Sequence, residues 1–365
     1  MKIQVEKTAL LEGLQMIQSV VSTRTTLPIL SNVLVRGEEN KLWLTTTDLE
    51  LTVRCAVEAK ILTAGATTLP ARRLFGIVRE LPADEIEIEV SEKDEASIQC
   101  GSSFFKIYGL SEDEFPPIQE FEGGNSYTID QRIFKEMLKM TSYAASADET
   151  RYVLNGVFFS FKGDKFTTVA TDGRRLALVE QEVEFPADAE ADAIVPSKTV
   201  SELLRNLGSE EAPLKIHTTK NQIAFEFSDV LIVSKLIEGT YPNVRQVIPS
   251  QCEERVTIER EGLLTAVKRV ALLTTDKSNT VKLSFGQNQL KITAITPDVG
   301  EAHETMAIKY AGKEIAVAFN PEFVMDPLRN ISGDEVYLEL TDELSPGVLK
   351  CDVPFLYVLM PMRVT

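Results

Sequence analysis

Residues Phe166–Val179 have the sequence FTTVATDGRRLALV, the pattern of a strand, a tight turn and a second strand. The β-branched run Thr167–Val169 favours a strand, and Asp172-Gly173 is a strong turn dipeptide. An isolated Asp-Gly hairpin would indicate little about the fold. This hairpin decides it because related stretches occur elsewhere in the chain at intervals of about one domain length.

A second copy lies 124 residues upstream, where Leu42–Val53 has the sequence LWLTTTDLELTV. The shift that places Thr47-Asp48 on Thr171-Asp172 also aligns the two opening strands without a gap. The other matching segments are Val5-Glu6 with Ile129-Asp130, Leu69–Pro82 with Val195–Gly208, and Glu114–Ile118 with Thr240–Val244. Agreement between separate segments predicts a duplicated domain.

A third copy follows. Val256–Val270 matches the opening helix pattern, and Leu290–Gly300 occupies the hairpin position with Pro297 in place of the aspartate. Phe319–Ser332 repeats the second helix, with Arg329 at the position of Arg79 and Arg205. Repeats of about 120 residues are domain-sized. We therefore expect three tandem α+β domains, at residues 1–122, 127–249 and 254–365, each with two helices packed on antiparallel sheets.

Composition indicates a soluble globular protein. The chain has 365 residues, 44% hydrophobic, and no apolar run approaches the roughly 18 residues of a membrane span. Its start, MKIQVEKTALLEG, predicts a strand leading into a helix and not a secretory signal. The four cysteines are scattered, which is typical of reduced thiols in a cytoplasmic protein.

The net charge of −17 is unevenly distributed. The six helix-like segments together carry +5, which leaves −22 for the rest of the chain. These segments are residues 7–24, 70–82, 130–140, 196–208, 259–277 and 321–332. If the helices share one surface, that surface is mildly basic on an acidic body.

The sequence contains no familiar catalytic motif. There is no phosphate-binding loop, no dinucleotide fingerprint and no zinc-protease motif, and the two histidines, His217 and His303, have no cysteine beside them. We predict no metal and no cofactor. Two alternatives to a DNA-binding ring stay open: a hydrolase with a site around Asp172 and Glu238, and an adaptor that only binds peptides. A turn-forming role for Asp172 is favoured, since Asp48 repeats it.

The repeat suggests a geometry. Twelve helices from two chains, spaced about 9 Å apart, give a ring about 34 Å across at the helix axes. Subtracting about 10 Å for one helix diameter leaves a bore of roughly 24 Å. A duplex about 20 Å across would pass through it. One chain alone would leave a bore of only about 7 Å by the same arithmetic, so a ring around DNA requires a head-to-tail dimer.

The motifs resemble those of the bacterial DNA polymerase III β subunit family, the sliding clamps, over the whole chain. They are TLPILSN (26–32), TDLE (47–50), ATTLPARR (66–73), RYVLNG (151–156), VATDGRRLA (169–177), SKLIEGTYPNVRQVIP (234–249), LKITA (290–294) and VLMPMRV (358–364). The resemblance implies a non-catalytic processivity factor. Its expected partners are duplex DNA, encircled without sequence specificity, a second copy of itself, and, through short linear peptides, the DNA polymerase III α subunit, the clamp loader, other polymerases and repair proteins.

The resemblance also implies site residues. Those expected to line the peptide pocket are Leu154, Thr171, Gly173, Arg174, Arg175, Leu176, Pro242, Val247, Val358, Leu359, Met360, Pro361, Met362 and Arg363. Those expected at DNA are Arg24, Arg73 and Tyr152. The ring junction would join Phe105 and Ile107 of one chain to Leu272 and Leu273 of the other, reinforced by Asp298, Glu301 and Glu304.

Three positions depart from the family pattern. Asp148 stands where a polar amide is familiar, Val153 where a second aromatic residue is, and Gln246 where a basic residue is often found. An acid beside a phosphate repels it, so Asp148 is expected to weaken the duplex contacts around residues 148–153. Gln246 is expected to remove one polar contact from the peptide pocket.

Overall fold

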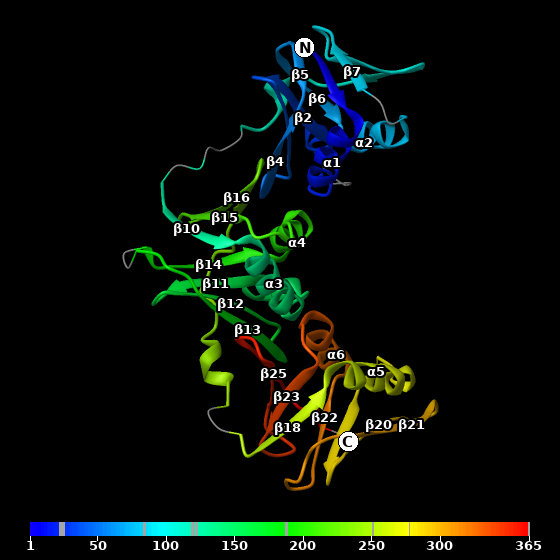
Figure 1. Cartoon of the computed structure of the whole chain (residues 1–365), viewed down its shortest axis with the longest axis vertical. Helices are drawn as coiled ribbons and strands as arrows, with labels where there is room; N and C mark the ends of the chain where they lie inside the picture. The colour runs from blue at the N-terminus through cyan, green and yellow to red at the C-terminus, as the bar shows by residue number, and fades with distance from the viewer. Residues whose placement is uncertain are drawn as a thin grey trace. The chain divides into compact units, whose positions relative to one another are not determined.

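The computed structural model describes residues 1–21, 26–82, 85–117, 121, 123–186, 189–249, 252–276 and 278–363. The elements of the first copy are β1 (Lys2–Glu6), α1 (Lys7–Ile17), β2 (Asn32–Glu38), β3 (Lys41–Thr47), β4 (Leu51–Glu58), β5 (Lys60–Thr63), β6 (Gly65–Pro70), α2 (Ala71–Glu80), β7 (Glu85–Val90), β8 (Glu95–Cys100) and β9 (Ser103–Tyr108). Those of the second are β10 (Asn125–Asp130), α3 (Gln131–Thr141), β11 (Gly156–Lys162), β12 (Lys165–Thr171), β13 (Arg175–Glu182), β14 (Ala191–Pro196), α4 (Ser197–Asn206), β15 (Pro213–Thr218), β16 (Gln222–Phe227) and β17 (Val230–Lys235). Those of the third are β18 (Glu254–Glu259), α5 (Arg260–Val270), β19 (Val281–Gly286), β20 (Gln289–Thr296), β21 (Gly300–Ala307), β22 (Ile315–Phe319), α6 (Pro321–Asn330), β23 (Glu335–Leu340), β24 (Gly347–Lys350) and β25 (Phe355–Leu359) (Figure 1).

Each helix forms where the repeat pattern predicts one, and in α3, α5 and α6 a local side chain fixes where the helix begins. Asp130 accepts the backbone N–H groups of the first turn of α3, and Glu259 does the same for α5. Asn320 accepts the Glu322 N–H at the start of α6. These are N-cap interactions, which satisfy donors that have no partner inside the helix. Two helices are shorter than expected: α1 ends at Ile17 and α5 at Val270.

Every copy contributes the same two antiparallel sheets. In the second copy one sheet has the order β10-β15-β16-β17 and the other β14-β11-β12-β13, and the third copy repeats this as β18-β23-β24-β25 and β21-β20-β19-β22. The first copy has the same two sheets, β1-β7-β8-β9 and β4-β3-β2-β6. Strand β5 extends the first of these sheets beside β1. Helix α1 packs against α2, and α5 packs against α6 (Figure 1).

Neighbouring copies join edge to edge through these sheets. Strand β17 of the second copy pairs with β4 of the first, and β25 of the third pairs with β13 of the second. Each junction makes one eight-stranded sheet. The contacts therefore divide the chain into two compact units, one of Met1–Lys135 with Lys198–Leu236 and one of Glu136–Ser197 with Ile237–Thr365. The middle copy is shared between them because each of its sheets continues into a different neighbour.

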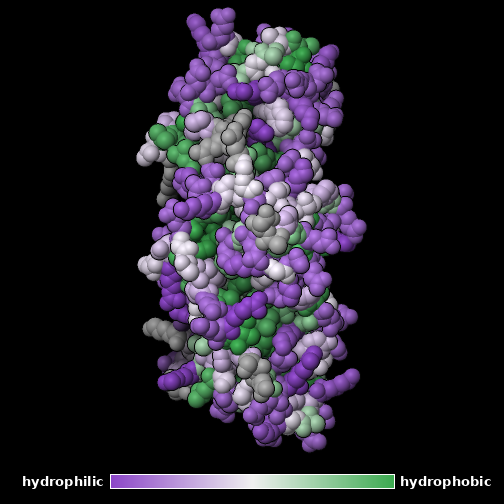
Figure 2. All heavy atoms as spheres, turned by 90° about the vertical axis from the view of Figure 1, so that its left-hand side faces the viewer, coloured by the Kyte–Doolittle hydropathy of each residue, from purple (hydrophilic) through white to green (hydrophobic). Residues whose placement is uncertain are grey.

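The predicted hairpin is confirmed. Thr171 of β12 faces Leu176 of β13, and the turn between them contains Gly173 at φ +85°, a conformation that favours glycine. The third copy forms the corresponding β20–β21 hairpin without the aspartate, pairing Thr296 with Gly300. On the face drawn in Figure 2, polar residues cover most of the surface and apolar residues gather in separate patches.

Candidate functional site

An apolar cluster in the second unit brings together several of the residues expected at the peptide pocket. Leu176 and Val358 are buried and paired across β13 and β25, and Leu154 packs against them. The other buried members are Val169, Leu178, Ile194 and Tyr241, with Val153, Phe158, Ile237, Val244, Ile248 and Leu356 packed around them. The cluster thus joins strands of the second and third copies to the segment that connects these copies.

The hairpin turn forms one border of this cluster. Asp172 Oδ1 accepts the N–H groups of Arg174 at 2.8 Å and Arg175 at 3.0 Å, and the Thr171 hydroxyl donates to the Arg175 carbonyl oxygen at 2.6 Å. Gly173 and Arg174 are exposed. A turn held by its own aspartate is rigid, so it presents Arg174 on a fixed support.

The C-terminal tail forms another border. The Met360 N–H donates to the Arg174 carbonyl oxygen at 3.0 Å, and the Met362 N–H donates to that of Ala318 at 2.7 Å. Although anchored by these bonds, Met360 stays 43% exposed and Met362 37% exposed, and Pro361 lies between them half-buried. Thioether side chains repack around different apolar partners, which suits a surface that accepts varied peptides.

The connecting segment supplies the last expected residues. Pro242 follows the buried Tyr241, and Val247 ends the short 3-10 helix Val244–Val247. Both Pro242 and Val247 are exposed, as are Gln246 in the same helix and Arg363 in the tail. Val247 is therefore an unburied apolar side chain next to the cluster members Val244 and Ile248.

Two further residues expected at the pocket, Arg175 and Leu359, have their side chains on the opposite face of the sheet from the apolar cluster. They face each other across β13 and β25, one position away from the Leu176–Val358 pair, so strand alternation turns them to the opposite face. There the Arg175 guanidinium pairs with Asp326 of α6 and with Asp172 at 3.1 Å, and stacks on Phe323 at 4.4 Å. Arg175 holds the second and third copies together behind the cluster.

Sequence reasoning missed several members of the cluster. Phe158 and Tyr241 stack with ring centroids 4.9 Å apart, and burial raises the pKa of Tyr241. Leu178 and Ile194 complete the floor. A signal was available for Leu178, which lies two residues from Leu176 and therefore on the same face of β13.

The first copy has polar side chains at the corresponding positions. The 124-residue shift places Thr45 on Val169, Thr52 on Leu176 and Arg54 on Leu178. Two threonines and an arginine cannot offer the apolar floor that valine and leucines provide in the second copy. This difference in composition favours the second and third copies as the site of an apolar peptide.

The structure describes two of the three residues expected to contact DNA. Arg24 lies outside the described residues. Arg73 is exposed on α2, and Tyr152 is exposed in the 3-10 helix Glu149–Leu154. Asp148 caps that helix, accepting from the Thr150 hydroxyl at 2.7 Å and the Thr150 N–H at 3.0 Å, which lower the pKa of its carboxyl. Val153 packs against the apolar cluster.

A polar hollow of about 470 Å³ lies between helices of the first unit. Its lining comes from α1 and the residues after it, from α2 and from α4, and comprises Gln15, Gln18, Ser19, Arg72, Phe75 and Arg205. Amides and guanidinium groups on helices are suited to phosphate contacts, which do not depend on base sequence. The sequence resemblance did not single out these residues.

Of the expected ring-junction residues, Phe105 and Ile107 lie on β9, an edge strand of the first unit. In the second unit Leu272 and Leu273 lie in the 3-10 helix Ala271–Leu273, and Glu301 and Glu304 lie on the edge strand β21. On β9, Phe104 and Tyr108 are 59% and 68% exposed, and Phe105 is also exposed. Ile107 lies two residues from Phe105, on the same face of β9, and is only 5% exposed. In the second unit Leu272 is strongly exposed, and Arg269 Nε donates to Glu304 of β21 at 2.9 Å.

No helix among the residues that the structure describes is long and apolar enough to cross a membrane. Within the same residues, no group of three or more histidine, cysteine, aspartate or glutamate side chains could hold a metal ion.

Known proteins match over the whole chain. The N-terminal, central and C-terminal domains of the DNA polymerase III beta subunit match residues 1–119, 128–243 and 245–363. The beta sliding clamp of Chlamydia muridarum is 35% identical over 363 residues, covering 100% of this chain and 99% of that protein. The beta sliding clamp of Escherichia coli K12 is 34% identical, covering 100% of both.

Solved structures agree with these relatives. A sliding clamp from Bartonella birtlesii, bound to griselimycin, superposes with a TM-score of 0.95 at 35% identity and full coverage of both chains. The sliding clamp of Bacillus subtilis gives the same TM-score at 27% identity, again with full coverage of both. The three repeated domains, the shared sheets and the agreement along the full length lead to one conclusion: the chain belongs to the DNA polymerase III beta subunit family, the sliding clamps.

Proposed function

We propose that this chain is a cytoplasmic processivity factor: two copies close head to tail around duplex DNA and tether DNA polymerase III through a peptide site. As a sliding clamp it is not itself an enzyme. Asp172, the candidate catalytic carboxylate of the hydrolase alternative, has its oxygens engaged by the turn and by Arg175, which supports a structural role for it.

The sheet edges carry the proposal. Strand β17 pairs with β4, and β25 pairs with β13, so the last strand of each later copy completes a sheet of the copy before it. The corresponding strands left over are β9, the last strand of the first copy, and β21, the counterpart of β4 and β13 in the third. An exposed edge is a template for pairing with another chain. Pairing β9 with β21 of a second copy repeats the internal junctions and closes a ring.

The internal junctions also predict the register of this pairing. Val230 faces Cys55, Ile232 faces Val53 and Ser234 faces Leu51. Aligning LWLTT (42–46) with LKITA (290–294) sets β21 on β4, and aligning the hairpin pair Cys100–Ser103 with Phe227–Val230 sets β9 on β17. This alignment places Ser103 of one chain opposite Glu304 of the other, and Phe105 opposite Ala302. The apolar side chains Phe104, Phe105 and Tyr108 would then be covered together with Leu272 and Leu273.

A cysteine pair tests that register. In Ser103→Cys/Glu304→Cys, directly opposed residues should form an intermolecular disulfide under mild oxidation, giving a species of twice 40.5 kDa. Each single variant is the matched control and should give no such species. A monomeric mass for the unmodified chain at micromolar concentration would contradict the proposed dimer.

The helices supply the proposed DNA-facing surface. Arg73, Arg72 and Arg205 lie on α2 and α4 of the first unit, and Tyr152 lies in the second. A mildly basic lining holds phosphates without reading bases, so the ring can slide. Asp148 is engaged by Thr150 and lies 3.8 Å from Arg151, which offsets part of its repulsion toward a phosphate.

The apolar cluster and its borders form the proposed peptide pocket. Leu154, Leu176 and Val358 make the floor, Val247, Met360 and Met362 the apolar rim, and Arg174 and Arg363 the cations for an acidic or polar peptide end. Its occupants would be short peptides of the polymerase α subunit, the clamp loader, other polymerases and repair proteins. Fluorescence anisotropy with such a peptide tests this: Met362→Ala should weaken binding, while Val353→Ala, which truncates an exposed residue outside the site, should not.

A further inference from the structure

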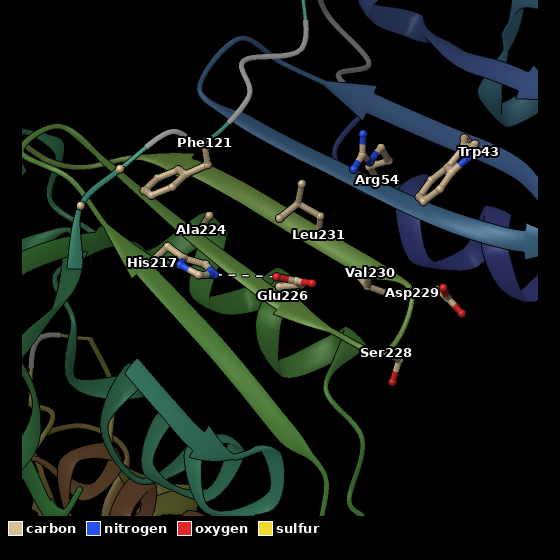
Figure 3. Close-up of a pocket in the computed structure, with 12 residues that line it drawn as sticks. Trp43, Arg54, Phe121, His217, Ala224, Glu226, Ser228, Asp229, Val230 and Leu231 are labelled. Carbon is tan, nitrogen blue, oxygen red and sulfur yellow. Dashed lines mark ion pairs between the residues drawn. The ribbon is translucent and has the colours of Figure 1, made fainter. Parts of the chain in front are cut away.

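A cavity of about 600 Å³ lies on one face of the eight-stranded sheet of the first unit. Figure 3 shows Trp43, Arg54, His217, Glu226 and Leu231 projecting from neighbouring strands toward it. This face is turned away from α1, because Arg54 alternates with Cys55, whose thiol lies 3.5 Å from the Gly13 carbonyl oxygen of that helix. Cavities of this size hold small ligands.

Arg54 is the unusual residue of the cavity. Its guanidinium stacks over the Trp43 ring at 4.8 Å, and its Nε is buried with no hydrogen-bond acceptor among the residues that the structure describes. Within that same part of the chain it also forms no ion pair, although acidic residues outnumber basic ones 55 to 38. A buried N–H group without an acceptor is unfavourable, and it is satisfied when a ligand supplies one.

The two acids of the cavity already face other bases. Glu226 Oε2 lies 3.7 Å from His217 Nε2, and Asp229 pairs with Lys41 at 2.7 Å. The positive charges of Arg54 and Lys41 equal in number the negative charges of Glu226 and Asp229, so the net charge of these four side chains is zero. A polyanion such as nucleic acid therefore gains no net attraction here, whereas a single carboxylate can bind the free guanidinium side without displacing either pair.

The rest of the lining is mostly apolar or aromatic, with Ser228 as a further polar side chain. The Trp43 ring, Val230 and Leu231 form the wall next to Arg54, and Phe121 lies beside His217 with ring centroids 5.9 Å apart (Figure 3). We propose that this cavity binds a carboxylate joined to an apolar group, with Arg54 binding the carboxylate and Trp43 packing against the apolar part. The ligand is either a free small acid or an acidic side chain of a peptide that carries an apolar neighbour.

The chain offers a direct reporter. Trp43 is its one tryptophan, so intrinsic tryptophan fluorescence reports on this cavity alone. Phenylacetate and the dipeptide acetyl-Phe-Asp-amide represent the two sources, and phenylacetamide is the uncharged match of phenylacetate. Both carboxylates are expected to give a saturable fluorescence change. Phenylacetamide is expected to bind at least tenfold more weakly. Tighter binding of the dipeptide assigns the site to a peptide, and tighter binding of phenylacetate assigns it to a small acid.

Variants identify the binding residue. Arg54→Gln should weaken carboxylate binding at least tenfold, and Arg54→Lys should retain part of it, because charge remains but the planar fork is lost. Arg255→Gln is the matched control, since Arg255 also stacks on an aromatic ring, Tyr337, at 4.4 Å, and it should titrate like the unmodified chain. Equal titration by phenylacetate and phenylacetamide, or equal affinity in Arg54→Gln with its fold intact by circular dichroism, would overturn the proposal.

Discussion

Replacing Arg175 by methionine should destabilise the second unit without changing the floor of the proposed peptide pocket. The Arg175 side chain is 10% exposed and pairs with Asp172 and Asp326, which are 17% and 21% exposed. It also donates to the Tyr143 carbonyl oxygen at 2.7 Å and stacks on Phe323. Methionine keeps much of the volume but leaves Asp172 without its cation and Asp326 with Arg329 alone, at 3.2 Å.

The size of the effect follows from this burial. Removing one partner of a buried ion pair costs about 3–5 kcal/mol, because the remaining charge is left uncompensated. Both carboxylates keep some contact with water, so we expect the lower end, about 3 kcal/mol. At 2–4 °C per kcal/mol for a unit of this size, the unfolding midpoint should fall by about 6–12 °C. Urea unfolding followed by circular dichroism measures the free energy directly.

Arg245→Met is the matched control. It removes an ion pair with Glu180 in which the arginine is 73% exposed, and should lower the free energy of unfolding by no more than about 1 kcal/mol. Because Arg175 faces away from the apolar cluster, Arg175→Met should change peptide affinity less than threefold at temperatures where it is folded. Unchanged stability together with a tenfold loss of peptide affinity would show that Arg175 lines the pocket after all.

Three further outcomes are expected. Deleting Met360–Thr365 should abolish peptide binding and leave the dimer intact in sedimentation analysis, because the tail borders the pocket and not the β9 or β21 edge; loss of the dimer would contradict this layout. Burial raises the pKa of the Cys55 thiol to about 12, so iodoacetamide at pH 8.5 should label Cys252 and spare Cys55 until unfolding, as mass spectrometry would show. Burial and, second, the hydrogen bond to Glu254 raise the pKa of Tyr310 to about 12. The contribution of the neutral Tyr310 hydroxyl to the free energy of unfolding should therefore be complete below pH 10 and be lost as the pH rises toward 12. An equally steep fall of that free energy with pH in Tyr310→Phe would refute the assignment.

The sequence predicted the hairpin, the repeats and the six helices because each depends on local signals. Asp172-Gly173 fixes a turn by its own chemistry, and recurrence at one spacing predicts a common fold for each copy. The sharing of sheets between copies could not be predicted, since an edge strand and a central strand carry the same apolar alternation.

The faces of the strands were also beyond sequence reasoning. In β13, Leu176, Ala177, Leu178 and Val179 are all buried, so hydrophobicity does not distinguish the pocket face from the helix face. The motif match therefore grouped Arg175 and Leu359 with the pocket, and Ile107 with the junction. Only strand pairing and burial separate them.

The central claim is that two chains close around DNA, and a topological test addresses it most directly. The Ser103→Cys/Glu304→Cys variant, placed on circular plasmid by the clamp loader and oxidised, should become a covalently closed ring. We predict that it stays on the circle in denaturing detergent and is released when a restriction enzyme linearises the DNA. Release in detergent from circular and linear DNA alike, despite complete cross-linking, would contradict the account.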